Sequence, residues 1–159
     1  MKEMTRVEGV RSETAVLVGV LLPNRKFQHD PLEELTGLAR TVGAHVEAEL
    51  VQRREVPDRA TYLGKGKVES LKMLVEQCGA DVVLFDNDLS PGQTRNLEKK
   101  LRVKVIDRTE LILDIFANRA RTTEARLAVE LAQLEYSLPR LKQMWTHLSR
   151  IEGGIGMRG

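Results

Sequence analysis

The sequence predicts an α/β fold: a small four-stranded parallel sheet flanked by helices, followed by a long C-terminal helical, coiled-coil-like arm. Short aliphatic runs alternate with amphipathic segments along the first part of the chain, which is typical of a parallel sheet covered on both faces. Beyond about residue 111, the apolar residues change to a helical heptad spacing. We therefore divide the chain into an α/β subdomain, residues 1–108, and a helical arm with a glycine-rich tip, residues 109–159.

The first half of the α/β subdomain contains two predicted strands and one helix. Residues 14–22 form a continuous valine-rich run, which is typical of a strand buried on both faces. A helix is expected next, with Asp30 as its N-cap, Pro31 at its first position and Gly43 ending it in the left-handed conformation. Residues 45–51 alternate in polarity, as a second strand does.

The second half of this subdomain adds two helices and two short strands. A loop over residues 53–67 precedes a helix that Gly79 closes. Residues 81–85 form a third buried strand. Ser90 caps the helix after it, with Gln93 reaching back in a capping box. Strands and helices thus alternate, which predicts right-handed crossovers and places the connecting loops at the carboxyl ends of the strands.

The last predicted strand, residues 103–106, leads into the arm, whose long helix we expect Thr109 to cap. In the arm, large apolar residues recur in steps of four and three, the spacing of a seam that packs against another helix: Leu127, Leu131, Leu134, Leu138, Leu141, Trp145 and Leu148. This register fails at Thr123. Nothing else in the sequence carries a matching seam. We therefore expect the partner helix either on another molecule or beyond residue 159.

Composition indicates a globular protein of a reducing compartment. The sequence is 42% hydrophobic and 30% charged, and its net charge of +2 is too small to indicate nucleic-acid binding by itself. The single cysteine, Cys78, excludes an internal disulfide. The longest apolar run is too short to span a bilayer, and no signal peptide opens the sequence. We expect a cytoplasmic protein without a membrane partner.

Four residues, Gly64, Lys65, Gly66 and Lys67, form a candidate anion- or nucleotide-binding segment. Two glycines and two lysines before a helix suit an anion, because helix N-termini favour negative charge. The segment is not a Walker A motif, because Val68 stands where Ser or Thr is required. A tight turn with solvated lysines explains the same residues more simply.

Three aspartates near predicted strand ends, Asp86, Asp88 and Asp107, are candidates for holding a metal or a ribose. We favour turn and cap chemistry for them, because Asp forms local hydrogen bonds in turns. The histidines are scattered and no metal-ligand spacing is present. We therefore expect no catalytic residue, no metal and no cofactor in this chain.

The arm carries basic residues that suit contact with RNA: Arg119, Arg121, Arg126, Arg140, Lys142, Arg150 and Arg158. Arginine pairs with phosphates and stacks on bases, so an arm that ends in glycines and arginine has a suitable shape for entering folded RNA. Pro139 lies inside the heptad run and should bend the helix.

Three stretches of the sequence resemble one known family. They are TYLGKGKVESL, FDNDLSPGQTRNLEKKLRVKVIDRTELILDIFANRARTTEARLAVELAQLEY and LPRLKQMWTHLSRIEGGIGMRG. In these motifs the chain closely resembles the N-terminal region of the HflX family of ribosome-associated GTPases, and the resemblance extends over nearly the whole chain from Thr14. In that family the glycine-rich segment continues into a second long helix and then a GTPase domain with a Walker A loop. The resemblance therefore implies that both would follow residue 159.

This resemblance implies a binding module rather than an enzyme. Members of the family bind the large ribosomal subunit, split stalled or stressed ribosomes and hydrolyse GTP, and their hairpin tip reaches towards the peptidyl-transferase centre. We accordingly expect binding to the large ribosomal subunit and its rRNA through Arg150, Gly153, Gly154, Ile155, Gly156, Met157, Arg158 and Gly159. GTP and magnesium are expected only in the GTPase domain, so this chain alone should not hydrolyse GTP.

Two alternatives from other functional classes stay open. The first is a small nucleotide-binding α/β domain that takes ATP or GTP at residues 64–67. The second is a coiled-coil dimerisation module, in which the unpaired seam of one arm forms a homodimer with the arm of a second copy.

Overall fold

The structure is a computed structural model that describes residues 10–24 and 30–151, with side chains described as far as Arg140. The described residues form one parallel sheet of β1 (Thr14–Leu21), β2 (His45–Arg53), β3 (Val82–Phe85) and β4 (Lys104–Asp107). The helices are α1 (Glu33–Thr41), α2 (Lys65–Cys78), α3 (Pro91–Leu101), α4 (Arg108–Arg119) and α5 (Thr123–Ile151). The predicted α/β class, with four parallel strands and a long C-terminal helix, is confirmed.

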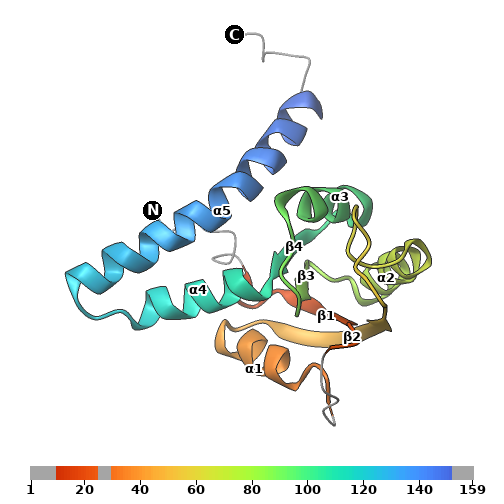
Figure 1. Ribbon diagram of the computed structural model, residues 1–159, viewed down its shortest axis with the longest axis horizontal. Coiled ribbons are helices and arrows are strands. Elements are labelled where there is room, and N and C mark those ends of the chain that lie inside the picture. The colour runs from red at the N-terminus through yellow and green to blue at the C-terminus, as the bar shows by residue number, and fades with distance from the viewer. Residues whose placement is uncertain (1–9, 25–29, 152–159) are drawn as a thin grey trace.

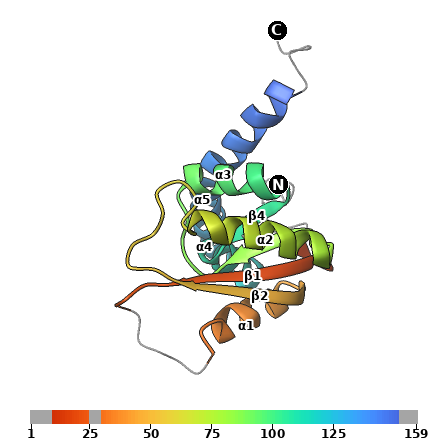
Figure 2. The ribbon, with the colours of Figure 1, turned by 90° about the vertical axis from the view of Figure 1, so that its right-hand side faces the viewer.

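Helices cover both faces of the sheet (Figures 1 and 2). Val16, Val18 and Phe85 lie in the core that α2 and α3 cover. Leu17 and Leu84, which alternate with them along the strands, lie in the core that α1 and α4 cover. Both faces of β1 and β3 are therefore buried, which explains why these strands read as continuous apolar runs in the sequence.

The strand order β2-β1-β3-β4 places a topological switch point between β1 and β3. Open parallel sheets usually bind ligands there, beyond the carboxyl ends of the strands. In this chain the side chain of Asn87, just after β3, takes up that position. Its amide oxygen accepts a hydrogen bond from the Val20 nitrogen at 2.8 Å, and its amide nitrogen donates to the Val20 carbonyl at 3.0 Å. Asn87 therefore extends the pairing of β3 with β1.

Several predicted helix ends are confirmed. Gly43 and Gly79 have φ values of +86° and +61° after α1 and α2, in the left-handed region that glycine tolerates best. Ser90 and Gln93 form the predicted capping box at the start of α3. The Gln93 nitrogen donates to Ser90 Oγ at 3.1 Å, and the Ser90 nitrogen donates to Gln93 Oε1 at 3.0 Å.

The predicted start of the first helix is wrong. Asp30 is not the N-cap of α1, which begins at Glu33. The Asp30 carboxylate instead accepts a hydrogen bond from the Leu32 nitrogen at 3.0 Å, and its carbonyl accepts one from the Glu33 nitrogen at 3.2 Å. Asp30 therefore closes a separate turn before the helix, a local role that aspartate often takes.

The predicted start of the second helix is also wrong, because α2 begins at Lys65 rather than after Lys67. Gly64 has the extended conformation of an N-cap, with φ −67° and ψ 156°. Its carbonyl accepts the first helical hydrogen bond, from the Val68 nitrogen at 3.0 Å. The glycine-lysine segment is therefore the first turn of a helix and not a loop before one.

The single long helix predicted for the arm is two helices. The backbone is extended at Ala120, with ψ 126°, directly after α4. Thr122 then caps the next helix, because its hydroxyl accepts a hydrogen bond from the Ala125 nitrogen at 3.0 Å. The break lies beside Thr123, where the heptad register fails in the sequence.

Helix α5 packs against α3 and α4 through a mostly polar face. Gln133, Ser137 and Arg140 are buried, whereas Leu127 and Leu131 are 60% and 58% exposed and Leu134 is half-buried. The helix starts beside α4, contacts α3 and extends past the α/β layers (Figures 1 and 2). Among the side chains that the structure describes, most leucines of the seam therefore do not belong to the surface by which α5 packs on its own chain.

The left-handed residue Gly79 gives a stability prediction. A Cβ at Gly79 would meet no heavy atom within 4 Å, so backbone conformation alone opposes a side chain there. Gly79→Ala should lower the free energy of unfolding by about 1 kcal/mol. The matched control is Gly37→Ala in the middle of α1, where a Cβ is equally free of contacts. This change should raise the free energy of unfolding by about 0.5–1 kcal/mol. Urea denaturation of both variants measures the two effects, and effects of the same sign would contradict the prediction.

Candidate functional site

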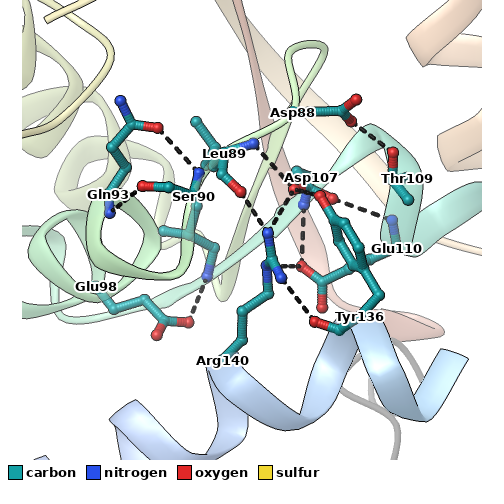
Figure 3. A network of polar contacts seen from close by, with 11 residues as sticks. Asp88, Leu89, Ser90, Gln93, Glu98, Asp107, Thr109, Glu110, Tyr136 and Arg140 are labelled. Atoms are coloured by element: carbon teal, nitrogen blue, oxygen red, sulfur yellow. Dashed lines mark hydrogen bonds and ion pairs between the residues drawn. The ribbon is translucent and has the colours of Figure 1, made fainter. Parts of the chain in front are cut away.

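A buried polar cluster lies where the carboxyl ends of β3 and β4 meet α5 (Figure 3). Its members are Leu89 from the segment after β3, Asp107 at the end of β4, Glu110 in the first turn of α4, and Tyr136 and Arg140 on α5. We call these five residues the arm junction. They join the α/β layers to α5 at the edge of the sheet where ligands commonly bind in this class of fold.

Asp107 is the N-cap of α4, so the prediction that Thr109 caps this helix is wrong. One carboxylate oxygen of Asp107 accepts a hydrogen bond from the Glu110 nitrogen at 3.0 Å. The Glu110 carboxylate reaches back to the Asp107 nitrogen at 3.4 Å, completing a capping box. Thr109 lies inside the first turn, and its hydroxyl donates to Asp88 at 2.6 Å. The helix begins at Arg108, directly after the end of β4 and two residues earlier than a Thr109 cap allows.

The second carboxylate oxygen of Asp107 connects two other segments. It accepts hydrogen bonds from the Leu89 nitrogen at 3.1 Å and from the Tyr136 hydroxyl at 2.5 Å. Burial raises the pKa of Asp107, although these hydrogen bonds and the charge of Arg140 oppose the change. Burial thus makes the Asp107 carboxylate costly to ionise, and its hydrogen bonds connect it to the segment after β3, to α4 and to α5.

Arg140 contributes a buried guanidinium to the arm junction. One terminal nitrogen donates to the Tyr136 carbonyl at 2.6 Å, and the other donates to the Leu89 carbonyl and lies 3.7 Å from an oxygen of Asp107. Nε lies 4.0 Å from Glu110 Oε1, and the guanidinium carbon lies 3.7 Å from the centroid of the Tyr136 ring. The planar fork of arginine matches this arrangement, because it offers donors in several fixed directions. The prediction that groups Arg140 with the RNA-facing arginines is therefore wrong.

Tyr136 acts in the arm junction as a hydrogen-bond donor. Burial, and then the nearby charge of Asp107, raise the pKa of Tyr136 far above its usual value. The hydroxyl therefore stays protonated and donates a hydrogen bond to Asp107. The ring also lies against Arg140, a cation–π contact that contributes more when it is shielded from water.

The polar groups of the arm junction hold α5 against the α/β layers. Its carboxylates and guanidinium bind one another and backbone groups of three segments. In the part of the chain that the structure describes, no three His, Cys, Asp or Glu side chains are grouped to hold a metal ion. The predicted cap chemistry is confirmed at Asp107, which caps α4. Asp88 instead accepts a hydrogen bond from the Thr109 hydroxyl of another segment.

The candidate anion segment lies apart from the arm junction, at the start of α2. The Gly64 nitrogen donates to Gln52 at 2.9 Å, and a Cβ on Gly64 would lie only 2.5 Å from a guanidinium nitrogen of Arg54. A side chain at Gly64 would therefore require the end of the Arg54 side chain to move. Lys65 and Gly66 are exposed, and Lys67 is half-buried. Anion binding by these residues stays a prediction.

The predicted RNA-binding tip falls almost entirely outside the described residues. Arg150 lies in α5, but its side chain is not among those described, and residues 153–159 lie beyond the described range. Their role in binding stays a prediction. Within the described part of the chain, no helix is long and apolar enough to cross a membrane.

Two protein-family models match consecutive parts of the chain. A model described as the GTP-binding GTPase N-terminal region matches residues 29–117, from before α1 to near the end of α4. A model described as the GTP-binding GTPase middle region matches residues 119–159, which include α5. The boundary between the two models thus falls close to the break between α4 and α5.

Curated relatives give the family its name. The GTPase HflX of Caldanaerobacter subterraneus subsp. tengcongensis is 48% identical over 159 residues, which is 100% of this chain. The GTPase HflX of Escherichia coli K12 is 47% identical over 147 residues, or 92% of this chain. The chain belongs to the HflX family of GTPases. It spans 36% and 34% of the lengths of these two HflX proteins and corresponds to their N-terminal region.

Solved structures support the HflX assignment at the level of the fold. A GTP-binding protein from the archaeon Sulfolobus solfataricus, in complex with GDP, superposes with a TM-score of 0.56 and 26% identity. The match covers 84% of this chain and 40% of that protein. A further structure, SsGBP with GDP, gives a TM-score of 0.60 at 25% identity, over 82% of this chain and 37% of the other.

The residues that sequence reasoning missed are Glu110, Tyr136 and Arg140. A signal for them was present, because Gln133, Tyr136 and Arg140 follow helical spacing on a stripe separate from the leucine seam. The regular leucines of the seam predicted a different face of the helix as its packing surface. The second, polar stripe indicates the face of α5 that packs on its own chain.

The raised pKa of Asp107 gives a prediction about pH. The folded protein keeps a proton on Asp107 at pH values above 3.8, where an ordinary aspartate has lost it. The contribution of Asp107 to the free energy of unfolding should therefore fall as pH rises above its ordinary pKa. Asp107→Asn removes this titration and keeps an acceptor for the Glu110 nitrogen. Urea denaturation at several pH values should show the parent's stability, relative to the variant, decreasing as pH rises above about 4. A relative stability that increases with pH would show that the hydrogen bonds outweigh burial.

Proposed function

We propose that this chain is the ribosome-binding N-terminal region of an HflX GTPase, which docks on the large ribosomal subunit and its rRNA and takes part in ribosome splitting under stress. Membership of the HflX family over the whole chain supports this proposal. The observation that carries it is the fixed attachment of α5 to the α/β layers. A helix held at a defined angle can carry a binding tip to a target at a distance from the body.

The dimensions of α5 agree with such a role. Its 29 residues give a length of about 44 Å at 1.5 Å per residue. The arm junction fixes the helix around Tyr136 and Arg140, and the remaining turns lead to the predicted tip residues. Arg150, in the last turn of α5, and Arg158, further along the sequence, would meet phosphates or bases.

The same proposal assigns GTP hydrolysis to another part of the HflX protein. Relatives that match this chain are GTPases, but the chain spans only about a third of their length. Its sequence contains no Gly-x-x-x-x-Gly-Lys-Ser/Thr segment to hold the phosphates and magnesium. We propose that this chain alone binds RNA and does not hydrolyse GTP.

Ribosome binding by the tip can be tested by co-sedimentation with purified large ribosomal subunits over a series of salt concentrations. We expect saturable binding that weakens as salt increases, because contacts with phosphates release counterions. Replacing Arg150 and Arg158 together with alanine should lower the affinity about tenfold or more, since two charged contacts are lost. The matched control is the double alanine variant of Arg119 and Arg121, which lie at the connection between α4 and α5.

Two results would contradict this assignment. Failure of the parent chain to bind at low salt would remove the proposed function. Equal loss of binding in the tip variant and in the control variant would show that total charge matters and that the tip has no special role.

The exposed seam favours a second candidate function, self-association of the chain through α5. Leu127, Leu131 and Leu138 are each at least half exposed, which is unusual for leucines in a regular row. Sedimentation velocity over about 1–100 µM should then show a dimer, a range in which moderate contacts are detectable. Leu131→Lys should shift the chain to monomer, whereas Glu130→Lys on the neighbouring exposed position should not. A monomeric parent throughout that range would dispose of this candidate.

A further inference from the structure

We propose that Arg140 is a positioning residue: its charge and hydrogen bonds set the direction of α5 relative to the sheet, and the helix is released when the guanidinium is lost. This inference goes beyond ribosome binding and depends on the proposed function only for its biological consequence. It rests on the chemistry of the contact face, on the balance of buried charge, and on which of the packed elements is free to move.

The face by which α5 contacts the chain is polar. Among the described side chains of α5, those that are buried are Gln133, Ser137 and Arg140, while Leu127, Leu131 and Leu138 are exposed. Apolar surfaces can slide over one another with little change in energy, because dispersion and hydrophobic contacts have no direction. Hydrogen bonds require defined distances and angles, so a polar contact face specifies one orientation.

Arg140 is the residue of that face which reaches the largest number of other segments. It contacts the segment after β3 through the Leu89 carbonyl, the end of β4 through Asp107, and the first turn of α4 through Glu110 (Figure 3). A rotation or a shift of α5 by one helical position would break all of these contacts together. The bond to the Tyr136 carbonyl also fixes the guanidinium on its own helix, one turn from its Cα.

The buried charges explain why the contact opens when Arg140 is lost. Asp107 and Glu110 are 0% and 2% exposed, and both pair with the same guanidinium. Without that cation, Asp107 and Glu110 would each lose an ion pair in a poorly hydrated site, which is unfavourable. The site can lower this energy by admitting water, and water enters only where two elements separate.

Of the two helices that meet at the arm junction, α5 is the one free to separate. Leu111 and Ile115 place α4 in the core beneath the sheet, and α4 follows β4 without a linker. Helix α5 joins α4 through a short extended connection at Ala120, and none of its side chains described up to Arg140 belongs to either core cluster. Loss of the guanidinium should therefore move α5 and leave the α/β layers intact.

A distance measurement between two spin labels tests this directly in the full chain. In a Cys78→Ser background, one label replaces exposed Glu69 on α2 and the other replaces exposed Glu130 on α5. Double electron–electron resonance should give a single narrow distance distribution for the parent. Arg140→Met should shift and broaden it, while circular dichroism keeps its helix and strand signal. The matched control is Arg119→Met, which removes the same side chain from an exposed position and should leave the distribution unchanged.

A second pair of variants separates charge balance from simple loss of packing. Glu110→Gln added to Arg140→Met removes one of the two carboxylates that pair with Arg140 and should restore part of the narrow distribution. A side chain that acts only by filling space would not show this rescue. Should Arg140→Met fail to fold, Arg140→Lys decides the question, because it keeps the charge without the planar fork and should give an intermediate width.

An unchanged distribution in a folded Arg140 variant would overturn the inference, and so would broadening of equal size in the Arg119 control. The measurement contains no ribosome, so its result is independent of the proposed function. A helix that is released in Arg140→Met, combined with a parent that does not bind large subunits, would retain the inference and remove the proposed function. An unchanged distribution in Arg140→Met, combined with a parent that binds large subunits, would remove the inference and retain the proposed function.

Discussion

The carboxylate of Asp107 is the group on which the arrangement of the chain depends. It ends β4, caps α4, holds the segment after β3 through Leu89 and accepts the Tyr136 hydroxyl from α5. Four elements therefore meet at one buried acid. Burying such a group is unfavourable unless its oxygens are fully hydrogen-bonded, so each of these partners also stabilises the position of the others.

Helix α5 has two faces with opposite chemistry, and each serves a different contact. The polar face contacts the α/β layers of its own chain, while Leu127, Leu131 and Leu138 remain exposed. An apolar seam is typical of association with another helix, because burying leucine is strongly favourable in water. A polar face supplies orientation at a smaller gain in stability. In the described part of the helix, hydrogen bonds thus set the direction of α5, while three leucines of the apolar seam stay exposed.

The sequence was sufficient for the features that depend on local chemistry. Continuous apolar runs predicted the buried strands, and the Ser90 capping box and the left-handed glycines Gly43 and Gly79 were recognised from residue type alone. The sequence was insufficient where two residues suit the same structural role. Both Asp107 and Thr109 suit an N-cap, and the choice depends on the exact end of β4. The burial of Arg140 depends on contacts with residues as far away as Leu89, which no local pattern encodes.

The side chain of Asn87 gives the α/β unit one further property. By pairing with both backbone groups of Val20, it completes the hydrogen bonding of the central strand at the position where related architectures hold a phosphate or a sugar. A ligand at that position would have to displace a neutral, geometrically matched group already supplied by the protein. The sheet therefore has the topology of a nucleotide-binding unit, while this part of its edge is occupied from within.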